Sequence, residues 1–409
     1  MTFVKVGIVA DFLEEGWPSM NLIAEELVNA QNALRDAGGN TLHPASGQEF
    51  SCHLIRPAMP RRLSQQGATA GRGYTFDRLA ARFYDYAQHL KKLRSQFALF
   101  HLADHSYSQL VHVLPASRTV VTCHDLDTFR CLWEPKLVER GPMFRAMTRR
   151  ILTGMQKAAH VCCVSHATRE ELLARRLLPP ERTSVVHSGV RTLFRTAEPG
   201  ADAAIGRLLM ADVSNPQSIR VLHVGSTIRR KRIDILLEVF CELLKVEPRA
   251  ILYRVGGPFT PAQQAMAESL GIAAHIRILP HLTGEELAAL YRGVDLVLQP
   301  SDAEGFGLPV IEALASGTPV LASDLPVLRE VGGSAAAYAR VGDVADWLSE
   351  ARRLLAERTA DPDAWAARRE ACRQQGMKFS WADTARQVAD IYRNVLSSAG
   401  CTSATGSSL

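Results

Sequence analysis

The sequence DAEGFGLPVIEALASG, residues 302–317, follows the apolar run DLVLQPS at 295–301. This run is typical of a buried strand, and Pro309 suits the first turn of a helix, so we predict a strand, a loop and then a helix over 309–316. Gly317 is expected to end the helix as a C-cap. Strand, loop and helix in this order form the repeating unit of a parallel α/β sheet.

The predicted loop presents four backbone N–H groups near the start of the helix. Unpaired N–H donors and the helix dipole stabilise anions at this position, and phosphate is the natural ligand. The four groups belong to Gly305, Phe306, Gly307 and Leu308.

Two carboxylates flank these amides, Glu304 before the loop and Glu312, which we place in the first helical turn. A glycosidase pair would need an acid and a base on opposite sides of one bond, which this spacing does not suggest. The two side chains are better placed to hold the hydroxyls of two sugars that flank a diphosphate. The alternative is that Glu312 complements the helix dipole and Glu304 is a solvated loop residue.

A basic loop follows another predicted strand, in HVGSTIRRKRIDILLEVF at 223–240. The strand ends at Gly225, and no acidic residue follows until Asp234. Clustered cations at the end of a strand would neutralise a diphosphate leaving group, although a solvated basic turn is the alternative. The cations are Arg229, Arg230, Lys231 and Arg232.

Strands and helices alternate along most of the chain, which predicts two Rossmann-like, doubly wound α/β domains that face one another. We place the first domain at 1–195 and the second at 196–377, with a crossing near TLFRTAEPGADAAIG. A final amphipathic helix over about 378–396 is expected to cross back to the first domain, and 397–409 to form a flexible tail. The functional site would lie in the cleft between the domains.

Two features of the first domain are candidates for this cleft. His124 closes the strand RTVVTCHD, although a buried or capping histidine is the commoner reading. Gly16 follows the first strand and would permit close approach of the backbone, or it makes only a turn.

Composition narrows the class of protein. The chain has 409 residues, 47% of them hydrophobic, which is enough for two cores. We find no apolar run long enough to span a bilayer and no signal peptide at the start, so we expect a cytoplasmic protein, with the inner face of the membrane as an alternative site. The eight cysteines lack zinc spacing and are interpreted as reduced thiols.

At this point the sequence resembles a known family. EGFGLPVIEALASGTPVLASD at 304–324 is similar to the Glu-x7-Glu motif of the retaining glycosyltransferases of family 4, which have the GT-B fold. The stretches VGSTIRRKRIDILLEVF, LPHLTGEELAALYRGVDLVLQPS, VSHATREEL and VVHSGV resemble other parts of the family in the same order. The resemblance extends from about residue 100 to 395.

The resemblance implies roles for the candidate residues. Glu304 would contact the hydroxyls of the donor sugar, Glu312 the ribose, and His124 would lie near the transferred sugar. The amides of residues 305–308, with Lys231 and Arg230, would hold the nucleotide diphosphate.

Two departures from the family pattern affect these roles. Family members often have an arginine directly after the glycine that matches Gly225, but Ser226 stands here, which would place more of the phosphate charge on Arg230 and Lys231. The first loop usually has paired glycines, whereas this one has Gly16 beside Trp17.

We therefore expect a retaining glycosyltransferase for polysaccharide or glycolipid assembly, which transfers a sugar from a nucleotide diphosphate sugar to an acceptor hydroxyl. The expected site is catalytic at His124, Glu304 and Lys231. Same-face attack through charge stabilisation would need neither metal nor cofactor. A non-catalytic protein that binds or senses sugar nucleotides is the alternative.

The expected partners are the sugar nucleotide and a saccharide or lipid-linked saccharide, without nucleic acid. Residues 1–190 hold 23 Lys and Arg against 17 Asp and Glu, which suggests an acidic acceptor or a membrane surface. A charged solvated face explains the excess equally well. Candidate residues are Arg61, Arg62, Arg72, Arg78, Arg140, Arg145, Arg149 and Arg150.

Overall fold

The computed structural model describes residues 3–38, 49–211 and 218–400. The chain divides into two compact units, each with its own parallel sheet. Unit 1 comprises Met1–Ser188 and Trp381–Leu409, and unit 2 comprises Gly189–Ser380. The sequence had suggested a boundary near residue 195.

Unit 1 is built on a six-stranded sheet in the order β2-β1-β3-β4-β5-β6, and neighbouring strands run parallel. Five of its strands are predicted by the apolar runs VKVGIVAD, FALFHLAD, RTVVTCHD, AAHVCCVS and TSVVHSG. β2 was missed because it lies at the sheet edge and only half of its side chains are buried. The strands are β1 (Val4–Val9), β2 (Phe50–Ile55), β3 (Leu99–Leu102), β4 (Thr119–Cys123), β5 (His160–Cys163) and β6 (Thr183–Val185).

Helices cover this sheet and pack against a core of buried aliphatic and aromatic side chains. The longest is the predicted first helix, which begins at a proline and is amphipathic. The helices are α1 (Pro18–Gly38), α2 (Arg72–Ala80), α3 (Tyr86–Leu93), α4 (Arg130–Trp133), α5 (Pro142–Lys157), α6 (His166–Ala174) and α15 (Trp381–Ser398).

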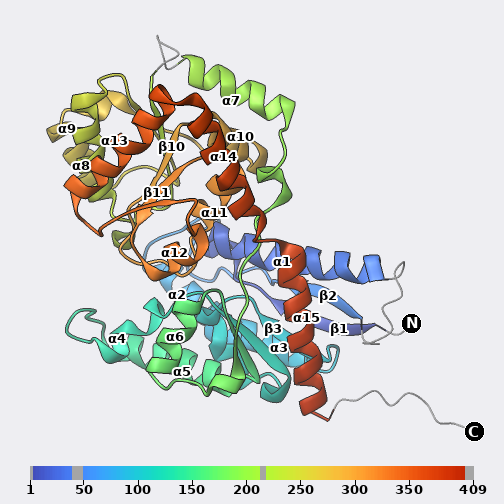
Figure 1. Ribbon diagram of the computed structural model, residues 1–409. Coiled ribbons are helices and arrows are strands. Elements are labelled where there is room, and N and C mark those ends of the chain that lie inside the picture. The colour runs from blue at the N-terminus through green and yellow to red at the C-terminus, as the bar shows by residue number, and fades with distance from the viewer. Residues whose placement is uncertain (1–2, 39–48, 212–217, 401–409) are drawn as a thin grey trace, which may run out of the picture. The chain divides into compact units, whose positions relative to one another are not determined.

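The C-terminal helix α15 belongs to unit 1 and lies beside α1 (Figure 1). The Gln31 side chain donates a hydrogen bond of 2.8 Å to the carbonyl of Ala385. Tyr392 is buried, and its hydroxyl oxygen lies 2.7 Å from Nδ1 of His101. Its ring packs edge-on against the ring of Phe50. The predicted return of this helix to the first domain is thereby confirmed, although the helix continues two residues into the expected tail, and residues 401–409 lie outside the described part.

Unit 2 has a second six-stranded parallel sheet, in the order β12-β11-β10-β7-β8-β9. Five of its strands are predicted by the apolar runs IRVLHVGS, RAILYRVGG, IRILPH, VDLVLQPS and TPVLAS, whereas β12 was missed. The expected pair of doubly wound α/β domains is thus confirmed as a fold class. The strands are β7 (Arg220–Val224), β8 (Ile251–Val255), β9 (Ile276–Ile278), β10 (Leu296–Gln299), β11 (Val320–Ser323) and β12 (Ala337–Ala339).

The helices of unit 2 surround its sheet and a core centred on α8 and α13. One expectation was wrong: the stretch read as an irregular crossing contains helix α7, because its alanine-rich sequence favours a helix after Pro199. The helices are α7 (Pro199–Ala211), α8 (Ile233–Val246), α9 (Pro261–Ser269), α10 (Gly284–Gly293), α11 (Leu308–Ala315), α12 (Pro326–Gly332), α13 (Val344–Ala360) and α14 (Pro362–Met377).

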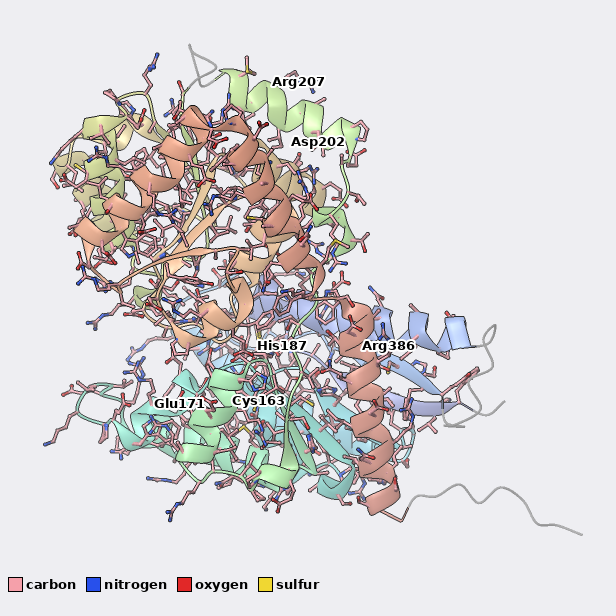
Figure 2. All side chains as sticks on the ribbon, viewed as in Figure 1. Cys163, Glu171, His187, Asp202, Arg207 and Arg386 are labelled. Carbon is pink, nitrogen blue, oxygen red and sulfur yellow. The ribbon has the colours of Figure 1, made fainter. Side chains whose placement is uncertain are left out.

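Two expectations about the chemistry of the chain concern cysteines and membrane spans. The cysteines of the described chain are all free and all but Cys241 are buried, with Cys163 in the sheet of unit 1 (Figure 2). Burial raises the pKa of the Cys163 thiol to about 12, which keeps it unreactive. Over the described residues, no helix combines the length and the apolar character that crossing a bilayer requires.

Candidate functional site

The loop between β10 and α11 carries four of the nine predicted donor residues, at positions 304–307. Gly307 caps the helix with φ of 103°, and a Cβ atom there would lie 2.8 Å from Cδ2 of Leu328. Only glycine adopts this conformation without strain, so the loop turns sharply into the helix. Helix α11 begins at Leu308, one residue earlier than predicted.

Glu304 is the centre of a polar cluster in this loop. Its side chain is 6% exposed, and Oε1 accepts hydrogen bonds from Lys231 Nζ at 2.5 Å, Ser301 Oγ at 2.8 Å and Gln299 Nε2 at 2.8 Å. Oε2 accepts from Nη1 of Arg230 at 3.2 Å. Burial alone would raise the pKa of this carboxyl, but Lys231 and Arg230 lower it to about 2. Glu304 is therefore ionised and rigidly held.

The basic loop after β7 forms a short 3-10 helix, Arg229–Lys231. The sequence shows no acidic residue beside these cations before Asp234, but the fold brings Glu304 against them. Lys231 is only 9% exposed and pairs with Glu304. The loops also join through the backbone, because Asp302 N–H donates to the carbonyl of Arg230 at 2.9 Å. Sequence spacing could not show this pair, since β7 and β10 are neighbours in the sheet but far apart in the chain.

Glu312 lies in the middle of α11, so its predicted placement in the first helical turn was wrong. The alternative, that it complements the helix dipole there, is not supported either. The side chain is 8% exposed, and Oε2 accepts a hydrogen bond of 3.2 Å from the hydroxyl of Tyr291. Burial raises the pKa of Glu312 to about 7, although Arg191 and the Tyr291 hydrogen bond oppose the rise. This carboxyl changes charge near neutral pH.

The predicted phosphate-binding amides lie at the start of α11. Gly305, Phe306 and Gly307 are buried, and Leu308 is half-buried. The Phe306 ring packs against Phe379 with centroids 5.8 Å apart. The packing of Phe306 against Phe379 therefore helps to fix the backbone of this loop.

His124 follows β4 in unit 1 and is 7% exposed. Its Nε2 lies 2.7 Å from the carbonyl of Ala103, which makes Nε2 the protonated nitrogen. Burial lowers the pKa of His124, with His105 adding to the effect, while Asp104 opposes it. The side chain is therefore a neutral imidazole at the carboxyl end of the sheet.

Buried acids surround this histidine, and most were missed in the sequence. Asp104 accepts hydrogen bonds from N–H and Oγ of Ser106 at 2.8 and 2.6 Å. Burial alone would raise the pKa of Asp104, but His105 and His124 lower it to about 2. Asp11, which is 3% exposed, has a pKa raised well above its usual range by burial and by Asp104. These acids follow β1 and β3, whose carboxyl ends meet at the same edge as that of β4.

Gly16 ends a short 3-10 helix, Leu13–Glu15, in unit 1. Its φ is +70°, and a Cβ atom there would meet nothing within 4 Å. Backbone conformation rather than crowding therefore requires glycine at this position. His124 and Gly16 belong to unit 1, whereas the other candidates belong to unit 2.

The two units match two different sequence families. Residues 46–193 match the model of Glycosyltransferase Family 4, and residues 211–377 match the model of Glycosyl transferases group 1.

Curated relatives match part of the chain. A D-inositol 3-phosphate glycosyltransferase from Thermobispora bispora is 34% identical over 240 residues, which cover 55% of this chain and 54% of that protein. An MMP alpha-(1->4)-mannosyltransferase from Mycolicibacterium hassiacum is 30% identical over 266 residues, which cover 64% of this chain and 60% of that protein. The matched region thus spans little more than half the length of these relatives.

Solved structures with the same fold match almost the whole chain. A sucrose-phosphate synthase from Thermosynechococcus elongatus has a TM-score of 0.72 at 19% identity and covers 97% of this chain and 100% of its own. Anabaena HepE in complex with UDP and glucose has a TM-score of 0.70 at 14% identity and covers 96% and 100%. Residues 46–193 and 211–377 are therefore similar to two glycosyltransferase families, and the chain shares the two-domain α/β fold of these solved structures.

Proposed function

We propose that this protein is a retaining glycosyltransferase that moves a sugar from a nucleotide diphosphate sugar to an acceptor hydroxyl. The observation that carries the proposal is the buried cluster of Glu304, Lys231 and Arg230 beside the start of α11. An ionised carboxylate suits sugar hydroxyls, and two cations with helix amides suit a diphosphate.

In this mechanism, Lys231 and Arg230 stabilise the negative charge that develops on the departing diphosphate. When the donor binds, the Lys231 ammonium group leaves its ion pair with Glu304 and pairs with the phosphate instead. The Glu304 carboxylate can then accept hydrogen bonds from the sugar hydroxyls. Because these cations and the amides of residues 305–308 supply the positive charge, we propose that transfer needs no metal. We further propose attack by the acceptor on the same face of the sugar as the leaving group, with retention.

His124 and Gly16 supply the contribution of unit 1 in this proposal. The neutral His124 imidazole would accept or donate hydrogen bonds with sugar hydroxyls without placing a cation near the anomeric carbon. Glu312, in unit 2, would bind the ribose hydroxyls of the donor.

Hydrolysis and transfer assays with a panel of nucleotide sugars test this function. UDP-glucose is the first donor to examine, because a solved structure with the same fold contains UDP and glucose. The expected result is slow donor hydrolysis without acceptor, with retention in the released sugar and activity that persists in EDTA. Binding of donors without any hydrolysis or transfer would instead favour the non-catalytic alternative.

We also propose that the acceptor is a saccharide or lipid-linked saccharide and that unit 1 binds an anionic membrane surface. The segment between α4 and α5 projects from unit 1 (Figure 1), and its Leu137 is 76% exposed. At the start of α5, Met143 is 70% and Phe144 is 41% exposed. Basic side chains accompany them, and none of these forms an ion pair within the described chain. They are Arg140, Arg145, Arg149 and Arg150.

The other basic group of unit 1 provides a matched control. Arg62 is paired with Asp85 at 2.7 Å, and Arg61 donates to the carbonyl of Ala68 at 2.8 Å, so both are engaged within the protein. In flotation with anionic vesicles, replacing Arg149 and Arg150 by glutamine should reduce binding, whereas replacing Arg61 and Arg62 should not. Equal binding by both variants would contradict the proposed surface.

A further inference from the structure

Arg254 is a buried cation without an acidic partner. It lies on β8, is fully buried, and forms no ion pair among the residues that the structure describes. Its guanidinium donates to the carbonyl of Gly225 at 3.0 Å and to that of Gly257. Nε has no hydrogen-bond partner, and burial lowers the pKa of the side chain to about 10.

The described neighbours of Arg254 include an aromatic ring but no carboxylate. The guanidinium carbon lies over the Phe259 ring, 5.1 Å from its centroid, a contact that brings no counterion. His223 is its partner in the β7–β8 register and is fully buried, with no hydrogen bond to either ring nitrogen. Burial lowers the pKa of His223 to about 3, and Arg254 and Lys231 add to the effect, so the ring is neutral. Lys231 is itself cationic and is already paired with Glu304. A buried charge without a counterion is costly, and buried charges in proteins are normally paired.

Arg254 also fixes the peptide that begins the basic loop. Gly256 has φ of +123°, and a Cβ atom there would lie 2.0 Å from the carbonyl oxygen of Gly225, so only glycine allows this close approach. The hydrogen bond from Arg254 goes to this same carbonyl of Gly225, so the C=O points toward the guanidinium. In a planar trans peptide the C=O and the following N–H point in opposite directions. The N–H of Ser226 is therefore directed away from Arg254.

We propose that Arg254 is a positioning residue for phosphate binding, which orients the N–H of Ser226 toward the bound phosphate and has the phosphate charge as its counterion. Members of the family that the sequence resembles often have an arginine at the position of Ser226. Here Arg254 would take the place of that arginine, with its guanidinium supplied from β8. The inference rests on the proposed donor site. A purely structural clamp on Gly225 and Gly257 is the alternative.

Calorimetric titration with inorganic pyrophosphate and with UDP distinguishes these roles. Arg254→Gln should weaken binding of both ligands about tenfold or more, the range for losing an interaction with a charged group. Adding Ser226→Arg to that variant should restore most of the affinity, because it returns a cation to the loop. Arg353→Gln is the control, since it removes an exposed arginine of unit 2 that pairs with Glu350 on the same helix.

The outcomes separate the inference from the proposed function. Wild-type affinity for both ligands in Arg254→Gln, or no recovery with Ser226→Arg, would overturn the role of Arg254 while leaving the donor site intact. Failure of the wild-type protein to bind either ligand would refute the donor site as well. If Arg254→Gln does not fold, Arg254→Lys provides the measurement, with weaker binding of both ligands at an unchanged melting temperature expected and wild-type affinity contradicting the proposal.

Discussion

Replacing Glu312 by glutamine should remove a pH dependence from the stability of unit 2. The pKa of the buried carboxyl is raised from 4.5 to about 7, so the native state holds a proton that the unfolded chain releases near 4.5. Stability from this group is complete below pH 4.5 and is lost as the pH rises through 7. Each pKa unit corresponds to about 1.4 kcal/mol, so the loss amounts to about 3 kcal/mol.

Urea denaturation at pH 5 and pH 8.5 measures this loss. Glutamine has nearly the same shape and can still accept the hydrogen bond from Tyr291, so the variant should fold. We expect the free energy of unfolding of Glu312→Gln, relative to wild type, to rise by up to about 3 kcal/mol between the two pH values.

A glutamate that is not buried provides the control for the effect of burial on this pH dependence. Glu247 is an exposed glutamate of the same unit, so Glu247→Gln should show the same difference from wild type at both pH values. If Glu312→Gln and wild type keep a constant difference from pH 5 to pH 8.5, the carboxyl is not protonated in the folded protein and the reasoning fails. A carboxylate that binds ribose would add a second effect, with donor affinity rising as the pH increases through about 7.

Three further changes test the site. Lys231→Ala should lower turnover by about two to three orders of magnitude, and unchanged donor hydrolysis would contradict its role. Glu304→Gln should impair transfer more than nucleotide affinity, and equal losses would count against a sugar contact. Because the pKa of Glu304 is lowered to about 2, wild-type stability from this group is present above pH 4.5 and lost as the pH falls toward 2, which the variant should not show in acid denaturation. Gly307→Ala should destabilise unit 2 by about 1–3 kcal/mol. Gly16→Ala should destabilise unit 1 by less, because an added Cβ at Gly307 would also lie 2.8 Å from Leu328, whereas one at Gly16 meets no described atom within 4 Å. Equal denaturation midpoints for Gly307→Ala and wild type would contradict this.

The alternation of apolar strands with amphipathic helices was sufficient to predict the fold. Strands such as β10, LVLQ, are buried on both faces and read as continuous apolar runs. The edge strands β2 and β12 were missed, because short or half-buried strands lack that signal. Helix α7 was missed because proline and glycine at its start were taken for a linker.

The donor site was predictable in its composition but not in its pairing. Glu304 and Lys231 were both identified, yet their ion pair depends on which strands are neighbours in the sheet. Gln299, at the end of a buried strand, gave a weak signal as a polar residue in an apolar run. Arg254 gave none, since an arginine in a strand is usually read as exposed.

The position of α15 has a consequence for the order in which the chain folds during synthesis. Unit 2 is continuous from Gly189 to Ser380, so all of its residues are synthesised before α15. Unit 1 begins first but lacks the helix that covers Phe50 and pairs with His101 until residue 392 emerges. N-terminal domains generally fold first, at a synthesis rate of about 5–20 residues per second. Here the first domain to appear is the last to be completed, and a chain that ends before Trp381 would contain every residue of unit 2 but lack α15 of unit 1.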